Sequence, residues 1–239
     1  MKNTLYIYSQ TQIGDHILCY SIVKFYAKQY DNIILLTRDL GSRHMENLRR
    51  LYSSLPSVSF IPFPNHESTL LFIKLNQDNN YLIFGHEDFV NALNSGKAKP
   101  FDEHFYETAK VPFNNKWDEF YFERDLEKEK DVFYNKLKLK DDEEFIFIHQ
   151  DPAREYFIDK KYIDNTVKRI RLEDLQDICL FDFFYTLERA KEIHEINSSM
   201  LTLIDIMQLK VKGKLFYHKY VRGSFYEQPR LKLNWQIIE

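Results

Sequence analysis

The chain has 239 residues, enough for one large domain or two small ones that each bury a core. Hydrophobic residues make up 44% and charged residues 29%, as in ordinary soluble globular proteins, and a net charge of -3 argues against a nucleic-acid binder. No apolar run is long enough for a membrane helix or a signal peptide, so we expect a cytoplasmic protein in which Cys19 and Cys179 stay reduced.

The first half of the chain alternates short apolar runs with helical patterns. Strands are predicted at residues 5–8, 32–37, 58–62 and 81–84. Helices are predicted at residues 17–30, 44–55, 69–75 and 102–109. Strands that alternate with helices predict a parallel sheet with right-handed crossovers.

The second half begins with a charged helix at residues 125–140 and then repeats the alternation. Strands are predicted at residues 145–148, 166–170, 192–196 and 213–217, and helices at residues 181–190 and 198–209, the last with Ser198 as its N-cap. The sequence therefore predicts an α/β protein with two Rossmann-like lobes, residues 1–124 and 125–239, whose parallel sheets face each other across a cleft.

A polar loop with Gly14 follows the first predicted strand and leads to Asp15 and His16. In a βα unit this loop lies at the carboxyl edge of the sheet, where ligands bind. Both side chains can move protons, so Asp15 is a candidate general base with His16 beside it. Helix N-capping is the alternative role for Asp15.

Histidines recur at predicted strand ends. Five of the eight lie there or in the loops just after: His16, His86, His149, His194 and His218. This placement predicts a ligand site at the sheet edges. No paired His/Cys spacing indicates a metal site. Dinucleotide, P-loop and nucleophile-elbow motifs are missing as well, so no cofactor is expected.

Several polar side chains could bind a phosphate or an acceptor. Ser198 and Ser199 open a predicted helix, which makes an anion site, although a plain N-cap also explains Ser198. Candidates on the loop after residues 145–148 are His149, Asp151 and Arg154, and those past the last strand are Lys219 and Arg222. The alternative role for Arg154, Lys219 and Arg222 is that of solvated surface cations. His86 and Glu87 are candidates for holding an acceptor.

The segment Ile13-Gly14-Asp15-His16-Ile17 resembles the start of GT-B-fold glycosyltransferases related to the heptosyltransferases (family 9-like). Further segments are similar to small predicted glycosyltransferases of bacteria, phages and large viruses. They are residues 105–109, 111–113, Trp117, 120–125, 192–194, 197–199 and 215–220. The resemblance spans most of the chain.

The resemblance implies a metal-independent enzyme that moves a sugar from a nucleotide-sugar to a glycan or other hydroxyl acceptor. The first lobe would bind the acceptor and the second the donor. Asp15 would be the base, which implies inversion at the sugar carbon. The diphosphate would bind Arg154, Ser198, Ser199 and Lys219, and His149 and His194 would lie near the nucleotide or the leaving oxygen.

Two other functions remain open. A nucleotide-sugar epimerase would share the fold and the phosphate site but need no acceptor. A non-catalytic binding protein of the same shape would not depend on Asp15. A nucleic-acid binder is a distant third.

Overall fold

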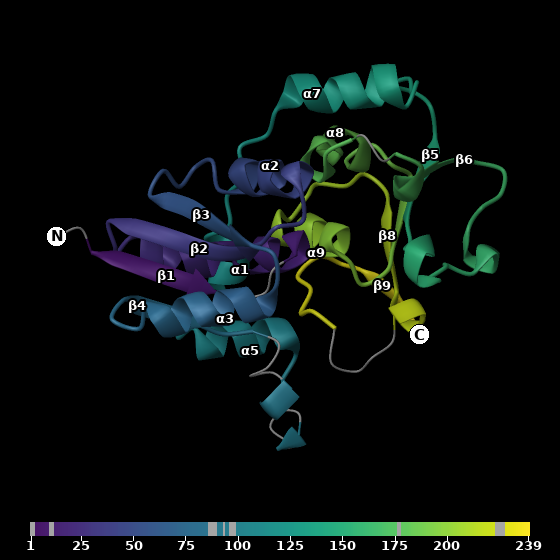
Figure 1. The fold of residues 1–239 in the computed structure, drawn as a ribbon. Coiled ribbons are helices and arrows are strands. Elements are labelled where there is room, and N and C mark those ends of the chain that lie inside the picture. The colour runs from purple at the N-terminus through teal and green to yellow at the C-terminus, as the bar shows by residue number, and fades with distance from the viewer. Residues whose placement is uncertain are drawn as a thin grey trace. The chain divides into compact units, whose positions relative to one another are not determined.

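The computed structural model describes residues 3–9, 12–85, 90–92, 94–95, 99–175, 178–222 and 228–239 (Figure 1). It divides into two compact units, Met1–Glu123 (unit 1) and Arg124–Glu239 (unit 2). In the described parts, each unit has one sheet in which all paired strands run parallel. Among the described residues, no helix has the length and apolar character needed to cross a membrane.

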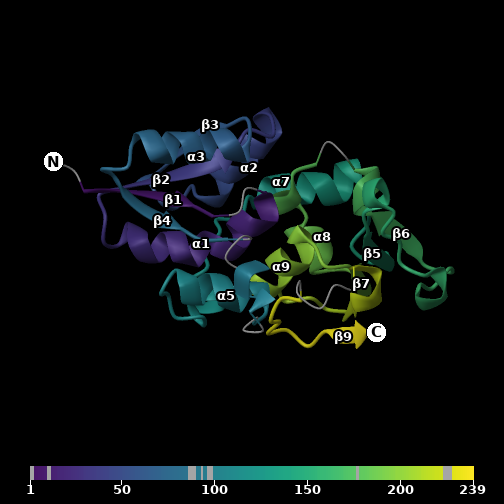
Figure 2. The ribbon, with the colours of Figure 1, turned by 60° about the horizontal axis from the view of Figure 1, so that its bottom comes forward.

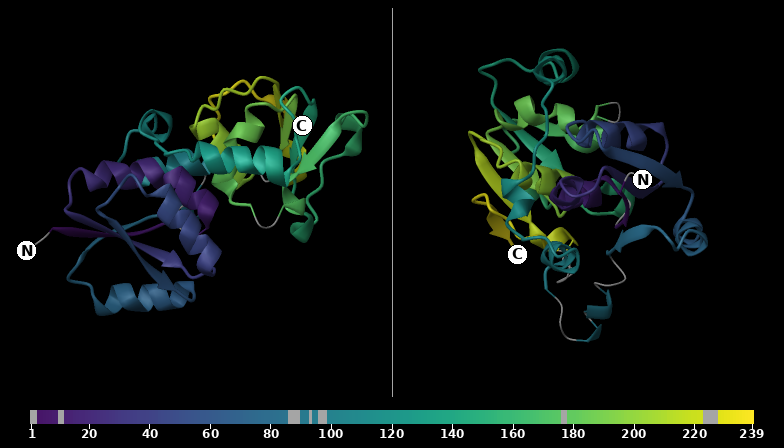
Figure 3. Two further views of the ribbon diagram at one scale, coloured as in Figure 1. Left: turned by 90° about the horizontal axis from the view of Figure 1, so that it is seen from above. Right: turned by 90° about the vertical axis from the view of Figure 1, so that its left-hand side faces the viewer.

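Unit 1 contains a four-stranded sheet with the order β3-β2-β1-β4. Its strands are β1 (Thr4–Tyr8), β2 (Asn32–Arg38), β3 (Val58–Phe63) and β4 (Asn80–Ile83). Its described helices include α1 (Ile13–Ala27), α2 (Ser42–Leu51), α3 (His66–Leu75), α5 (Phe101–Thr108) and α6 (Asn115–Asp118). Helices cover both faces of this sheet (Figure 3, left), which explains why β1 and β2 are apolar runs with few polar interruptions.

Helix α1 begins four residues earlier than predicted, at Ile13. Gln12 and Asp15 form a capping box, in which the Gln12 backbone N–H donates to the Asp15 carboxylate over 3.2 Å. This contact satisfies one of the amides that a helix start leaves without a partner. Asp15 and His16 therefore lie in the first turn of a helix and not in a loop.

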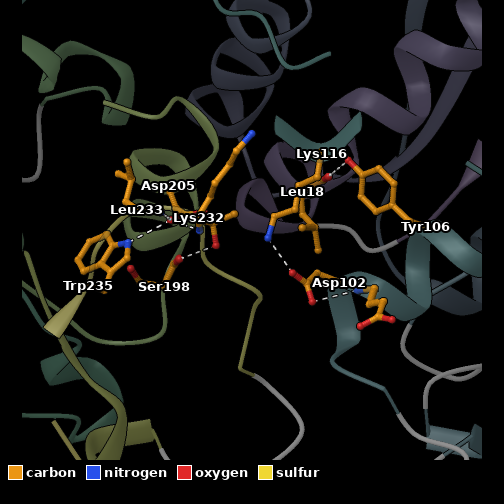
Figure 4. Close-up of polar contacts among 11 residues, drawn as sticks. Leu18, Asp102, Tyr106, Lys116, Ser198, Asp205, Lys232, Leu233 and Trp235 are labelled. Atoms are coloured by element: carbon orange, nitrogen blue, oxygen red, sulfur yellow. Dashed lines mark hydrogen bonds and ion pairs between the residues drawn. The ribbon is translucent and has the colours of Figure 1, made fainter. Parts of the chain in front are cut away.

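A buried ion pair joins α5 to α6 in unit 1 (Figure 4). The Lys116 ammonium lies 2.7 Å from the Asp102 carboxylate, and their side chains are 1% and 0% exposed. Beside this pair, the Tyr106 hydroxyl donates to the backbone carbonyl of Leu18 in α1 over 3.0 Å. The hydrogen bond from Tyr106 therefore ties α5 to α1, the helix that carries Asp15.

Unit 2 contains a five-stranded sheet with the order β6-β5-β7-β8-β9. Its strands are β5 (Phe145–His149), β6 (Lys168–Arg171), β7 (Glu192–Glu195), β8 (Lys214–His218) and β9 (Gln236–Ile238). Its α-helices in the described part are α7 (Leu126–Asp131), α8 (Phe184–Leu187) and α9 (Ser199–Ile206), and α8 and α9 lie beside the strands in Figure 2.

The predicted helix 125–140 is shorter and irregular. Asp125 caps α7 by accepting from the Lys128 backbone N–H, and a π-helical segment, η1 (Val132–Lys136), follows α7 directly. The predicted helix 181–190 is likewise reduced to a 3-10 turn, η5 (Leu180–Asp182), and α8.

Strand β9 was not predicted, and a buried carboxylate on α9 holds the chain that leads to it. Asp205, 0% exposed, accepts hydrogen bonds from the backbone N–H groups of Lys232 and Leu233, both at 2.9 Å, and from the Trp235 indole at 3.1 Å (Figure 4). Because these donors belong to the irregular segment before β9, Asp205 sets the path that places β9 against β8.

Candidate functional site

The carboxyl ends of β5 and β7 bring three polar side chains together in unit 2. His149 ends β5 and Glu195 ends β7, and the two residues are direct neighbours in the sheet register. His149 Nδ1 and Ser198 Oγ each lie 3.0 Å from the same oxygen, Glu195 Oε2. We call this arrangement the His149–Glu195–Ser198 cluster. Glu195 was not predicted as a functional residue.

The electrostatics of the cluster follow from burial and charge. The Glu195 side chain is fully buried, which raises its pKa although His149 and Ser198 act in the opposite direction. Burial lowers the pKa of His149, but the carboxylates of Glu195, Glu173 and Asp151 outweigh this effect, so the net shift is upward. Both shifts favour retention of a proton by the pair.

The Ser198 hydroxyl is already engaged on both sides. It donates to Glu195 Oε2, and it accepts from the Leu201 backbone N–H over 3.1 Å as the N-cap of α9. The predicted N-cap is therefore confirmed, but the hydroxyl proton is not available to a phosphate in this arrangement. Ser199 follows as the first residue of α9 and is half-buried.

The structure gives the predicted cations different surroundings. Arg222 Nη1 donates to the Asn197 carbonyl over 3.1 Å, so its guanidinium lies beside the start of α9. Arg154 is half-exposed and lies 3.5 Å from Asp151, whose backbone pairs with Tyr156 to close the loop. Lys219 forms an ion pair with Glu239. Arg222 was predicted only as a cation past the last strand, and the structure places it beside the start of α9.

His194 and His218 lie on the opposite face of the sheet from His149, because strand residues alternate between faces. Both are completely buried. The His194 Nε2 atom is 3.2 Å from Glu192, which can only accept, so His194 Nε2 carries the hydrogen. His218 Nε2 then donates to His194 Nδ1 over 2.8 Å. This places His194 in the interior of the sheet and not at the ligand edge, where we expected it.

Burial lowers the pKa values of both imidazoles, that of His218 to about 4. Since the unfolded chain binds these protons near pH 6.5, stability should fall as the pH decreases from about 6.5 toward 4. Removing the His218 titration should reduce this loss by on the order of 2 kcal/mol. We expect His218→Gln to show a shallower pH dependence of stability than the wild type in urea unfolding. Equal slopes in the wild type and in His218→Gln would contradict this account.

The unit 1 candidates separate into a core residue and a residue at the start of α1. His16 is 3% exposed, its Nε2 lies 3.1 Å from the Thr37 hydroxyl, and burial with the nearby His44 lowers its pKa to about 3. A neutral, enclosed imidazole packs in the core and is poorly placed to transfer protons. We therefore do not propose His16 as a catalytic group. Asp15 is half-buried and holds the capping-box contact. His86 and Glu87 lie outside the described residues.

Acidic, histidine and cysteine side chains do not gather into a metal-binding set in the described part of the chain: no group of three or more is placed to hold an ion.

Among solved structures, the chain is similar to the ADP-heptose LPS heptosyltransferase II of E. coli. The superposition has a TM-score of 0.56 and 14% sequence identity, and it covers 100% of this chain and 90% of that one. No protein-family model and no curated protein matches the sequence. The predicted α/β fold with two parallel sheets, like that of the heptosyltransferases, is therefore confirmed.

Proposed function

We propose that this chain is a glycosyltransferase that moves a sugar from a nucleotide-sugar to the hydroxyl group of a glycan or another acceptor, in the cytoplasm and without a metal ion. The fold likeness to a heptosyltransferase over the whole chain supports the general class. The observation that carries the proposal is the His149–Glu195–Ser198 cluster at the carboxyl edge of the unit 2 sheet, beside the start of α9. Open α/β sheets bind their ligands at this edge.

In this proposal unit 2 binds the donor diphosphate. The candidate ligands are His149, the backbone N–H groups and hydroxyl at Ser199, and the guanidinium groups of Arg222 and Arg154. Together they would offset the negative charge that develops on the leaving diphosphate, a task that a divalent ion performs in other transferases.

Unit 1 supplies the base and the acceptor site. Asp15 would take the proton of the acceptor hydroxyl as its oxygen attacks the sugar carbon, and direct displacement by that oxygen implies inversion. His86 and Glu87 remain proposed acceptor residues. One observation favours the non-catalytic alternative: Asp15 already has a structural task, because it accepts the Gln12 N–H at the start of α1.

A thermal-shift screen tests donor binding. The name of the similar structure contains ADP-heptose, so ADP and ADP-sugars are the first probes, followed by their UDP, GDP and CDP counterparts. A true ligand at about 100 times its dissociation constant should stabilise the protein by roughly 2.7 kcal/mol. The shift should persist in EDTA and disappear with the plain nucleoside. No shift with any nucleotide or nucleotide-sugar would count against the proposal.

A further inference from the structure

Glu195, at the end of β7, contacts both the end of β5 and the start of α9. Its Oε2 atom shares a hydrogen bond with His149 Nδ1 at the end of β5 and accepts from Ser198 Oγ at the start of α9, and the side chain is 0% exposed. Within the described part of the chain, Oε1 is buried and has no hydrogen-bond partner. A buried carboxylate in this position requires a proton or a cation nearby.

The His149–Glu195 pair has two relevant protonation states. When the pair holds its titrating proton, either as imidazolium with carboxylate or as neutral imidazole with carboxylic acid, His149 Nε2 carries a hydrogen. When the pair loses that proton, Nδ1 donates to Glu195 and Nε2 becomes a bare acceptor. Only the first form can donate to an anion.

The surroundings of His149 favour the protonated form. Three acidic residues act on it from separate elements: Glu195 in β7, Glu173 in the 3-10 turn η4 (Leu172–Asp174) and Asp151 in the loop after β5. They outweigh the effect of burial, and the pKa of His149 is raised. Its side chain is 16% exposed, and no described residue bonds Nε2, on the ring edge opposite Glu195.

We propose that His149 Nε2 donates a hydrogen bond to the diphosphate of the nucleotide-sugar, and that Glu195 is the positioning residue that keeps the hydrogen on this atom. Glu195 also accepts a hydrogen bond from Ser198 at the start of α9. It thereby fixes the imidazole relative to the first backbone amides of this helix, which would bind the same anion. This inference rests on the proposed function, and it makes donor binding dependent on pH.

The test is calorimetric titration of ADP-glucose and UDP-glucose between pH 5.5 and 9.5. These probes are diphosphate diesters with no terminal phosphate to titrate in this range, so a pH dependence seen with ADP-glucose reports on the protein. The uracil of UDP-glucose loses its N3 proton near the top of the range, so its profile is compared only below that point. The variants are His149→Gln, which removes the imidazole, and Glu195→Gln, which keeps the shape but not the charge. The matched control is Glu192→Gln, on the same strand but the opposite face, where the carboxylate contacts the buried His194.

The wild-type affinity should fall at least tenfold as the pH rises through the titration of the pair. His149→Gln should bind at least tenfold more weakly at pH 6.5 and show no such titration. Glu195→Gln should lose affinity at a lower pH than the wild type, a change that lost helix capping alone would not produce. Glu192→Gln should keep the wild-type profile.

The inference is overturned if His149→Gln binds as tightly as the wild type, or if Glu195→Gln keeps the wild-type pH profile, while the wild type binds a probe. The proposed function could then still stand. Absence of binding to either probe in the wild type at every pH would overturn both together. The wild-type pH profile is informative even if a variant does not fold.

Discussion

Replacing Asp15 by Asn is expected to slow sugar transfer by roughly 10²–10⁴-fold, the usual contribution of a general base. The Asn side-chain oxygen can still accept from the Gln12 N–H, so the start of α1 should be retained. The measurement is the release of nucleoside diphosphate from the nucleotide-sugar in the presence of acceptor, together with donor affinity. Donor affinity should not change, because Asp15 belongs to unit 1.

A second helix in unit 1 offers a matched control for a capping effect. The Asn65 side chain caps α3 by accepting from the Ser68 backbone N–H over 2.9 Å. Asn65→Ala should reduce stability by about 1 kcal/mol without reducing the transfer rate. If Asp15→Asn transferred sugar at the wild-type rate, the capping box would be the whole role of Asp15, and the non-catalytic alternative would gain support.

Replacing Lys116 by Met should reduce the free energy of unfolding by about 3–5 kcal/mol, because it leaves the Asp102 carboxylate buried without its cation. It also removes the ammonium that lies 4.6 Å from the Trp117 ring centroid. Urea unfolding measures the loss.

The comparison for this variant is Lys28→Met, which removes an ammonium that is 57% exposed and 3.1 Å from Glu119. Exposed pairs contribute about 0–1 kcal/mol, so its stability should stay near that of the wild type. The double variant Asp102→Leu/Lys116→Met should regain much of the lost stability, since neither charge of this pair remains buried. Equal effects of the two single Lys variants would contradict the role given to the buried pair.

Most strands of the two sheets could be predicted because they are local apolar runs between turn residues, whereas β6 is mainly charged and β9 was not predicted. β2 begins at Asn32 and β5 at Phe145, the residues at which these two strands were predicted to begin. The start of α1 could not be read in this way, because the capping box uses polar residues that otherwise indicate a loop. The π-helical η1 could not be predicted, because the sequence pattern of residues 125–140 is that of a regular helix.

The site was harder to predict than the fold. His194 and Glu195 are adjacent in sequence, but alternation places one on each face of the sheet. Which of them meets His149 depends on the register between β5 and β7, set by contacts 46 residues apart. The sequence indicated histidines and serines as ligands, whereas the structure makes Glu195 the group that organises His149 and Ser198.

A crystal structure of the protein with ADP-glucose or UDP-glucose, whichever binds, tests the central claim most directly. We expect the diphosphate at the carboxyl edge of the unit 2 sheet, with its oxygens about 3 Å from His149 Nε2 and from the backbone N–H of Ser199. A nucleotide-sugar bound elsewhere, with these two groups facing only solvent, would contradict the account.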